Sequence, residues 1–61
     1  MNEVFILYLI IFDENTNTYY NQIYGVYSTK ALAQSFEAVA RAENSDDVSV
    51  VDYKIAHWSV I

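Results

Sequence analysis

"VFILYLIIF", at residues 4–12, is a run of nine apolar residues near the start of a chain of 61 residues. It is rich in β-branched and aromatic residues and is followed by the polar segment DENTNT, so its length and composition predict a β-strand. A strand with one covered face alternates apolar and polar residues, whereas this one is apolar on both faces. The run therefore predicts a central strand, and it raises the question of what covers its second face.

A second strand is predicted by YYNQIYGVY at residues 19–27, which follows the polar loop and pairs with the first strand as a hairpin. Strict alternation directs one set of side chains to one face and the remainder to the other. The first set is Tyr20, Gln22, Tyr24 and Val26, and the second is Tyr19, Asn21, Ile23, Gly25 and Tyr27.

A helix is predicted over residues 29–42, because Ser28 or Thr29 is a good N-cap and the segment contains no Gly or Pro. Its apolar residues recur at helical spacing and predict the buried face: Leu32, Phe36, Val39 and Ala40. The opposite side carries Lys30, Gln34, Glu37 and Arg41. After ENSDD, residues 48–61 predict a third strand with one apolar and one mixed face.

These elements predict a single α+β domain over residues 1–61, with the order ββαβ. The first two strands are antiparallel neighbours, and the helix is a crossover that returns the third strand parallel to the second, on the far side of the first. We therefore expect a three-stranded antiparallel sheet of order 2-1-3 with one helix on one face. This order also keeps the most apolar strand away from a sheet edge, where it would promote aggregation.

The size of the chain makes a monomer marginally stable. Apolar burial contributes about 90 kcal/mol for a chain of this mass, and ordering its residues costs about the same. There is no cysteine, which excludes disulfides and thiolate metal sites, and a single histidine leaves only carboxylates to hold a metal. Oligomerisation is the remaining way to gain stability.

The uncovered sheet face is the predicted interface. It consists either of Phe5, Leu7, Leu9 and Ile11 or of Val4, Ile6, Tyr8, Ile10 and Phe12, and the sequence leaves this choice open. Either set forms a larger apolar patch than soluble monomers normally expose. A two-fold homodimer is the expected solution, and the predicted interface residues are Leu7, Leu9, Ile11, Tyr20, Tyr24 and Trp58. There are three alternatives: a dimer that exchanges HWSVI at residues 57–61, a partner of another kind, and a tightly twisted sheet whose tyrosines fold over their own strand.

The formal charge of −5, with only Lys30, Arg41 and Lys54 as basic residues, disfavours binding to phosphate backbones and anionic membranes. The apolar run is too short to span a bilayer, and neither a basic segment before it nor a cleavage site after it indicates a signal peptide. We expect a soluble cytoplasmic protein.

Few residues suggest chemistry. His57 and Ser59 share a strand face, and Asp13-Glu14 and Asp46-Asp47 are paired carboxylates in polar connections, where such residues serve turn geometry. The sequence therefore predicts no catalytic, metal or cofactor site, and tyrosines and Trp58 are better explained as protein-contact residues.

The segment YGVYSTKALAQ, at residues 24–34, resembles a class of small bacterial and phage ββαβ proteins. In these a tyrosine-rich second strand ends in Gly-aromatic-Ser-Ser/Thr-Lys and an alanine-rich helix follows. In size and expected dimeric form the chain is similar to the Hachiman anti-defence proteins, which act against a helicase and nuclease system. The resemblance implies a phage-encoded inhibitor that binds a host defence protein, and it transfers no functional residue by motif.

The sequence thus predicts a non-enzymatic homodimeric protein-binding module, and the resemblance implies an inhibitor of a bacterial antiviral system. A small bacterial regulatory or accessory protein is the alternative. A nucleic-acid mimic and a nucleic-acid-binding sheet are less favoured, because carboxylates are few and strands 1 and 2 carry no Lys or Arg.

Overall fold

The computed structural model describes residues 2–60, so Met1 and the last residue of the predicted third strand, Ile61, lie outside the described residues. The elements in chain order are β1 (Asn2–Asp13), β2 (Thr18–Tyr27), α1 (Lys30–Glu43) and β3 (Val50–Val60).

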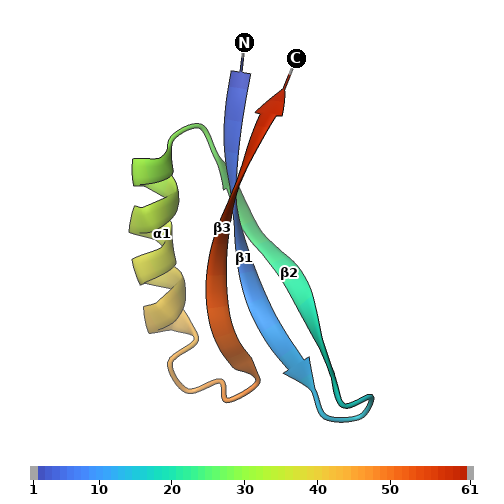
Figure 1. Ribbon diagram of the computed structural model, residues 1–61. Helices are drawn as coiled ribbons and strands as arrows, with labels where there is room; N and C mark the ends of the chain where they lie inside the picture. Colours follow the sequence, from blue (N-terminus) through green and yellow to red (C-terminus); the bar gives the residue numbers. More distant parts are fainter. Residues whose placement is uncertain (1, 61) are drawn as a thin grey trace.

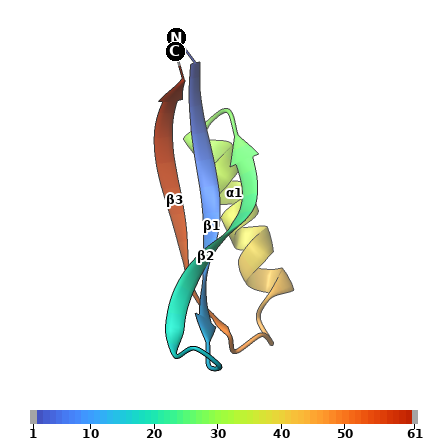
Figure 2. The ribbon, with the colours of Figure 1, turned by 90° about the vertical axis from the view of Figure 1, so that its right-hand side faces the viewer.

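The predicted ββαβ architecture is confirmed. The three strands form one sheet of order β2-β1-β3, and β1 pairs antiparallel with both neighbours. The helix lies along one face of the sheet, and the other face carries no layer (Figures 1 and 2). The β1–β2 turn and the α1–β3 loop lie at one end of the molecule, and the start of β1 and the end of β3 lie at the other (Figure 1).

The odd-numbered residues of β1 face the helix and form the core. Leu7, Leu9 and Ile11 are buried there, and helix residue Ala40 packs with them. Partly buried residues of β2 and β3 surround this cluster: Tyr24, Tyr27, Val50, Tyr53 and Ile55. The choice left open by the sequence is thereby settled, because Val4, Ile6, Tyr8, Ile10 and Phe12 point to the uncovered face.

A β-bulge interrupts the alternation of β2. Leu7 pairs with Gly25 and Tyr8 pairs with Ile23, so Tyr24 is the extra residue. Beyond the bulge every side chain changes face relative to strict alternation. The prediction for the end of β2 is therefore wrong: Val26, opposite Ile6, lies on the uncovered face, whereas Tyr27, opposite Phe5, lies on the helix side.

The helix begins as predicted, with Thr29 as the N-cap whose Oγ1 accepts a hydrogen bond from the Leu32 amide at 3.2 Å. Its rotation differs from the prediction. Ala33 and Ala40 are the buried helix residues, whereas the large apolar side chains are 40–44% exposed: Leu32, Phe36 and Val39. At about 100° per residue, this apolar stripe is turned about 90° from the line of the buried alanines.

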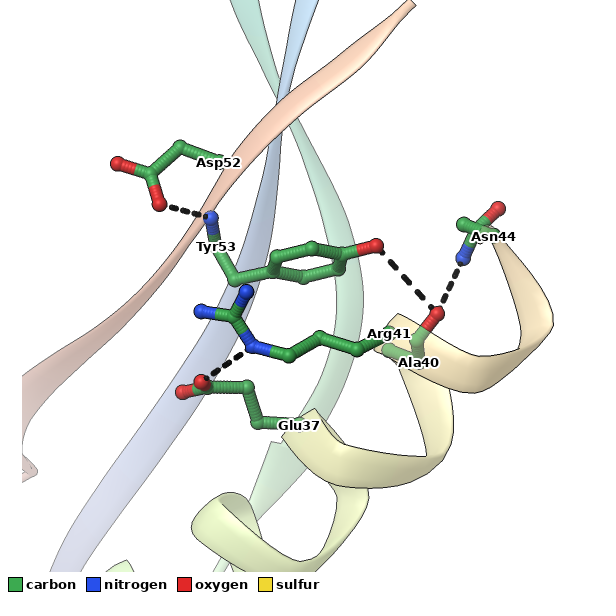
Figure 3. Close-up of polar contacts among 6 residues, drawn as sticks. All are labelled: Glu37, Ala40, Arg41, Asn44, Asp52 and Tyr53. Carbon is green, nitrogen blue, oxygen red and sulfur yellow. Dashed lines mark hydrogen bonds and ion pairs between the residues drawn. The ribbon is translucent and has the colours of Figure 1, made fainter. Parts of the chain in front are cut away.

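Tyrosines on both flanks of the helix explain this rotation. On the β3 side, the Tyr53 hydroxyl donates to the Ala40 carbonyl at 3.4 Å, and the Arg41 guanidinium lies 4.5 Å from the centre of the Tyr53 ring (Figure 3). Glu37 accepts a hydrogen bond from Arg41 Nε at 2.9 Å and so holds the guanidinium in place (Figure 3). Because large rings occupy this flank, the helix approaches the sheet through its small alanines.

The β2 flank is built in a similar way. The Tyr27 ring stacks on Phe36 with centroids 4.9 Å apart, and the Tyr24 hydroxyl donates to the Glu43 carboxylate. Tyr27 lies directly over Gly25, where a Cβ would collide with the tyrosine ring. The glycine therefore allows the ring to reach the helix, and its φ is not positive.

Candidate functional site

The uncovered side of the sheet is the candidate surface for binding a partner, and we call it the open face. Its central row comes from β1 and its two flanking rows come from β2 and β3. The central row is Val4, Ile6, Tyr8, Ile10 and Phe12; the β2 row is Tyr19, Asn21, Ile23 and Val26; and the β3 row is Asp52, Lys54, Ala56, Trp58 and Val60.

The open face is apolar and accessible along the whole sheet. Its central row is half-buried between the flanking strands. The large flanking side chains are 46–66% exposed: Tyr19, Ile23, Val26, Trp58 and Val60. Large apolar groups that are continuous over such a length usually mark a contact surface for another molecule.

Folding of the tyrosines over their own sheet does not close this surface. Phe12 and Tyr19 form the one ring pair described within the open face, with centroids 5.1 Å apart. This pair lies at the hairpin end of the sheet, and Tyr19 itself remains 66% exposed. The middle and the far end of the face lack such a cover among residues 2–60.

The charges leave the open face neutral. Its only charged residues within the described chain are Asp52 and Lys54, both on β3. Asp52 Oδ1 accepts a hydrogen bond from the Tyr53 amide at 2.8 Å (Figure 3). The other seven acidic and two basic residues, out of eight and three in the sequence, together carry the formal charge of −5. The acidic character of the protein therefore lies outside this face.

The structure divides the predicted interface residues. Trp58 lies on the open face and is 56% exposed. Leu7, Leu9 and Ile11 are buried beneath the helix, which corrects the prediction for these three residues. Tyr20 pairs with Ile11 on the helix side, and Tyr24 packs against the core and bonds to the helix, so neither belongs to the open face.

Sequence reasoning missed several residues of this surface, including Ile23 and Val26 on β2, which are each 57% exposed. The strict alternation of β2 placed these two on opposite faces, whereas the bulge brings both to the open face. The glycine within the strand, Gly25, was the available signal, because an isolated strand glycine often marks a bulge.

The Tyr24 hydroxyl, which donates to the Glu43 carboxylate, has a strongly raised pKa. The hydrogen bond to Glu43, with smaller contributions from burial and from charge repulsion, raises the pKa of Tyr24 to about 12. Tyr24 is the bulged residue of β2, and Glu43 ends the helix, so this contact ties the bulge to the helix C-terminus. The hydroxyl donates to a carboxylate that serves packing, and no second polar side chain among the described residues bonds to the pair.

The histidine is engaged by neighbours that do not include a nucleophile. His57 Nε2 lies 3.0 Å from Glu3 Oε1, and the imidazole stacks on Phe5 with centroids 4.7 Å apart and an interplanar angle of 8°. Its ring is on the helix side of the sheet, opposite Phe5. Within residues 2–60 no hydrogen bond joins His57 to Ser59.

One carboxylate of each acidic pair accepts hydrogen bonds within its own turn. Asp13 Oδ1 accepts from the Asn15 amide at 2.9 Å. Asp47 Oδ1 accepts from the Ser49 hydroxyl at 2.6 Å and from the Ser49 amide at 3.0 Å, and these bonds lower the pKa of Asp47. Nowhere in the described part of the chain do three His, Cys, Asp or Glu side chains gather in a metal-binding group.

A hollow of about 470 Å³ lies where the hairpin turn meets the α1–β3 loop. It is lined by loop residues and strand ends, including Asp13, Tyr20 and Val48. Ile11 of the core cluster forms part of its wall, and Asp13 is already bonded within its own turn. Among the described helices, none is both long and apolar enough to cross a membrane.

Comparisons with family models, with curated proteins and with solved structures found no match to the chain. The resemblance of residues 24–34 to small phage and bacterial proteins therefore stays a prediction, and the functional argument rests on the open face.

Proposed function

We propose that the protein is a non-enzymatic protein-binding module that acts through its open face. The observation that supports this proposal is an apolar surface along the whole sheet with large side chains 46–66% exposed. A protein that covers these side chains removes them from water, which favours binding by about 25 cal/mol per Å² of apolar surface buried. The aromatic side chains Tyr8, Tyr19 and Trp58 supply contact area, and each carries a polar atom that can form a hydrogen bond, as is common at protein interfaces.

Protein is a better ligand for this face than nucleic acid. Base stacking on an aromatic sheet requires basic residues nearby to hold the phosphates. Lys54 is the only basic residue on the open face, and the formal charge of −5 repels a phosphate backbone. Filter binding at low and moderate salt checks this point, and a salt-sensitive micromolar affinity for RNA or DNA would contradict the assignment.

The class of target that we propose is a bacterial antiviral defence protein, and the proposed compartment is the cytoplasm of the host cell. This choice rests on the resemblance of the segment at residues 24–34 and on nothing in the geometry. The acidic surface outside the open face is the region that such a target would meet once the open face is covered.

Capture from a bacterial lysate with three versions of the protein tests the binding function. The first is the wild type, the second is Trp58→Glu, and the third is Val48→Glu. Trp58 lies on the open face and is 56% exposed, whereas Val48 is 95% exposed in the α1–β3 loop. Both substitutions add one negative charge at an exposed position, so neither changes the core.

Untagged copies of the same chain are added to the lysate, so that binding of the protein to itself is also detected. We expect wild type and Val48→Glu to retain the same set of proteins. Trp58→Glu should lose them, because a carboxylate in the covered face has to be desolvated. Retention by all three versions, or by none of them, would contradict a binding role for the open face.

A further inference from the structure

We infer that the open face is covered by a second copy of the same chain, in a two-fold dimer with the two sheets packed face to face. This inference rests on the proposed function, because it names the partner of the same surface. The helices then form the outer layers and the two sheets form the centre. Sheets that pack in this way lie about 10 Å apart with their strands inclined by about 30°.

The size of the open face matches what a stable dimer needs. Three strands spaced about 4.8 Å apart, of which the longest has twelve residues, define a face of at most about 15 by 40 Å, or about 600 Å² in projection. The molecule itself extends 41 Å along its longest axis. The accessible area exceeds the projected area because side chains stand out from the sheet, which brings it near the 800 Å² that each partner buries in a standard interface.

The total accessible surface of the protein is larger than expected for a folded monomer, which is consistent with one sheet face that is buried only in a complex. Its accessible area is 4485 Å². A folded monomer of 7.0 kDa is expected to expose about 4,000 Å². The excess is what a flat molecule with one unpaired sheet face produces, and the second and third dimensions of 23 and 11 Å describe such a flat molecule.

The distribution of charge selects a second copy over an oppositely charged partner. Two molecules that each carry −5 repel one another over most of their surfaces. The open face is the exception, because Asp52 and Lys54 cancel and the remainder of the face is uncharged. A basic partner would find no opposite charge to pair with on this neutral face, whereas a like-charged copy meets the least repulsion there.

The arrangement of the face also satisfies two-fold symmetry. An isologous interface uses the same patch on both subunits, so the patch has to be complementary to itself. Here a half-buried central row of aliphatic and aromatic side chains is flanked on both sides by more exposed groups, such as Ile23 on β2 and Trp58 on β3. The raised groups of one copy can lie beside those of the other over the central rows.

Two substitutions that reverse the charge of a lysine test this dimer. Light scattering on a sizing column measures the mass of each protein, and sedimentation measures the dissociation constant of the dimer. Lys54→Glu changes the open face from neutral to −2 in each copy. Lys30→Glu makes the same change in net charge at the start of the helix, on the other side of the molecule. Both lysines are exposed, so both variants are expected to fold, which circular dichroism checks.

We expect the wild type to have twice the 7.0 kDa mass of one chain at tens of micromolar. Lys54→Glu should raise the dissociation constant at least about tenfold, because like charges then face one another across the interface, and Lys30→Glu should raise it less than about threefold. Asn21→Glu, which adds a charge to the β2 row, should act like Lys54→Glu, so the test does not depend on one variant.

A wild type that stays monomeric at several hundred micromolar would overturn the dimer. Capture of other proteins in a Trp58-dependent manner would then leave the binding function standing with a different occupant, and no such capture would refute both. Equal weakening of the dimer by Lys54→Glu and Lys30→Glu would also overturn the inference, because it would place the contact elsewhere.

Discussion

Substituting Ala for Leu7 and for Leu32 makes the same chemical change at two positions, and it tests which of the two leucines is buried in the core. The amphipathic pattern of the helix predicts Leu32 as a core residue. In the structure Leu7 is 0% exposed and Leu32 is 44% exposed. Replacing either with Ala removes the same isopropyl group, so the two losses in the free energy of unfolding show which side chain lies in the core.

The expected magnitudes differ clearly. Leu7→Ala leaves a cavity between β1 and the helix and should cost about 3 kcal/mol, since fully buried leucines cost about 2–5 kcal/mol. Leu32→Ala loses only part of the transfer free energy and leaves no closed cavity, and the higher helix propensity of Ala offsets part of that loss. We expect its cost to be below about 1 kcal/mol.

Thermal unfolding followed by far-ultraviolet circular dichroism, at equal protein concentrations, measures the difference. In domains of this size 1 kcal/mol corresponds to about 4–8 °C in Tm. Leu7→Ala should therefore lower Tm by at least about 12 °C or leave the chain unfolded at room temperature, and Leu32→Ala should lower it by less than about 8 °C. Equal or inverted shifts would mean that Leu32 packs on the sheet, and the helix rotation described above would be wrong.

Three further outcomes follow from local contacts. Gly25→Ala should lower the free energy of unfolding of the wild type by about 1 kcal/mol, because the new Cβ displaces the Tyr27 ring. In a Tyr27→Ala background the same substitution should be neutral or stabilising. A stabilising effect in both backgrounds would refute the role of the ring. The wild type should lose stability between about pH 10 and pH 12, and Tyr24→Phe should remove this loss. The pKa of Tyr24 is raised in the folded protein, so its neutral, hydrogen-bonded hydroxyl stabilises the fold below pH 10, and this contribution disappears as the hydroxyl ionises. The same dependence of the melting temperature on pH in both proteins would contradict this role of Tyr24. Thr29→Ala should cost about 1 kcal/mol through loss of the N-cap and Thr29→Ser much less, and equal melting temperatures of these two variants would show that the cap bond is unimportant.

The order of the strands could be predicted because the sequence leaves the first strand a single suitable place. A run that is apolar on both faces is stable only between two neighbours, and a hairpin followed by a helical crossover supplies them. The structure confirms the order β2-β1-β3 and the single helix layer. These features depend on composition and on connection rules, which do not require knowledge of side-chain contacts.

The faces of the strands could not be predicted in the same way, because one inserted residue inverts the pattern. Tyr24 adds a residue to β2, and Val26 and Tyr27 exchange sides as a result. The choice for β1 was decided by tertiary packing, although Tyr8 gave a usable hint. Its hydroxyl in the middle of the even-numbered row is easier to leave near water than to bury.

The rotation of the helix depends on contacts between distant residues. Periodicity places Leu32, Phe36 and Val39 on one stripe, but it does not contain the position of the tyrosine rings that arrive from β2 and β3. Once these rings occupy the flanks, the small side chains of Ala33 and Ala40 give the closest approach to the sheet. A pattern confined to the helix carries no information about this competition.

Bulges in both outer strands have a consequence for self-assembly. Tyr24 divides β2 near its middle, so the β2 border offers no long regular row of amides to an incoming strand; in β3 the register shifts only beside Ile11, near the start of the strand, and residues 52–60 stay regular. The Tyr53 amide is already bonded to the Asp52 side chain. Growth by strand addition, the route to fibrils, is therefore obstructed along the β2 border, whereas at the β3 border it is hindered only near the start of the strand, by the register shift and by the engaged Tyr53 amide.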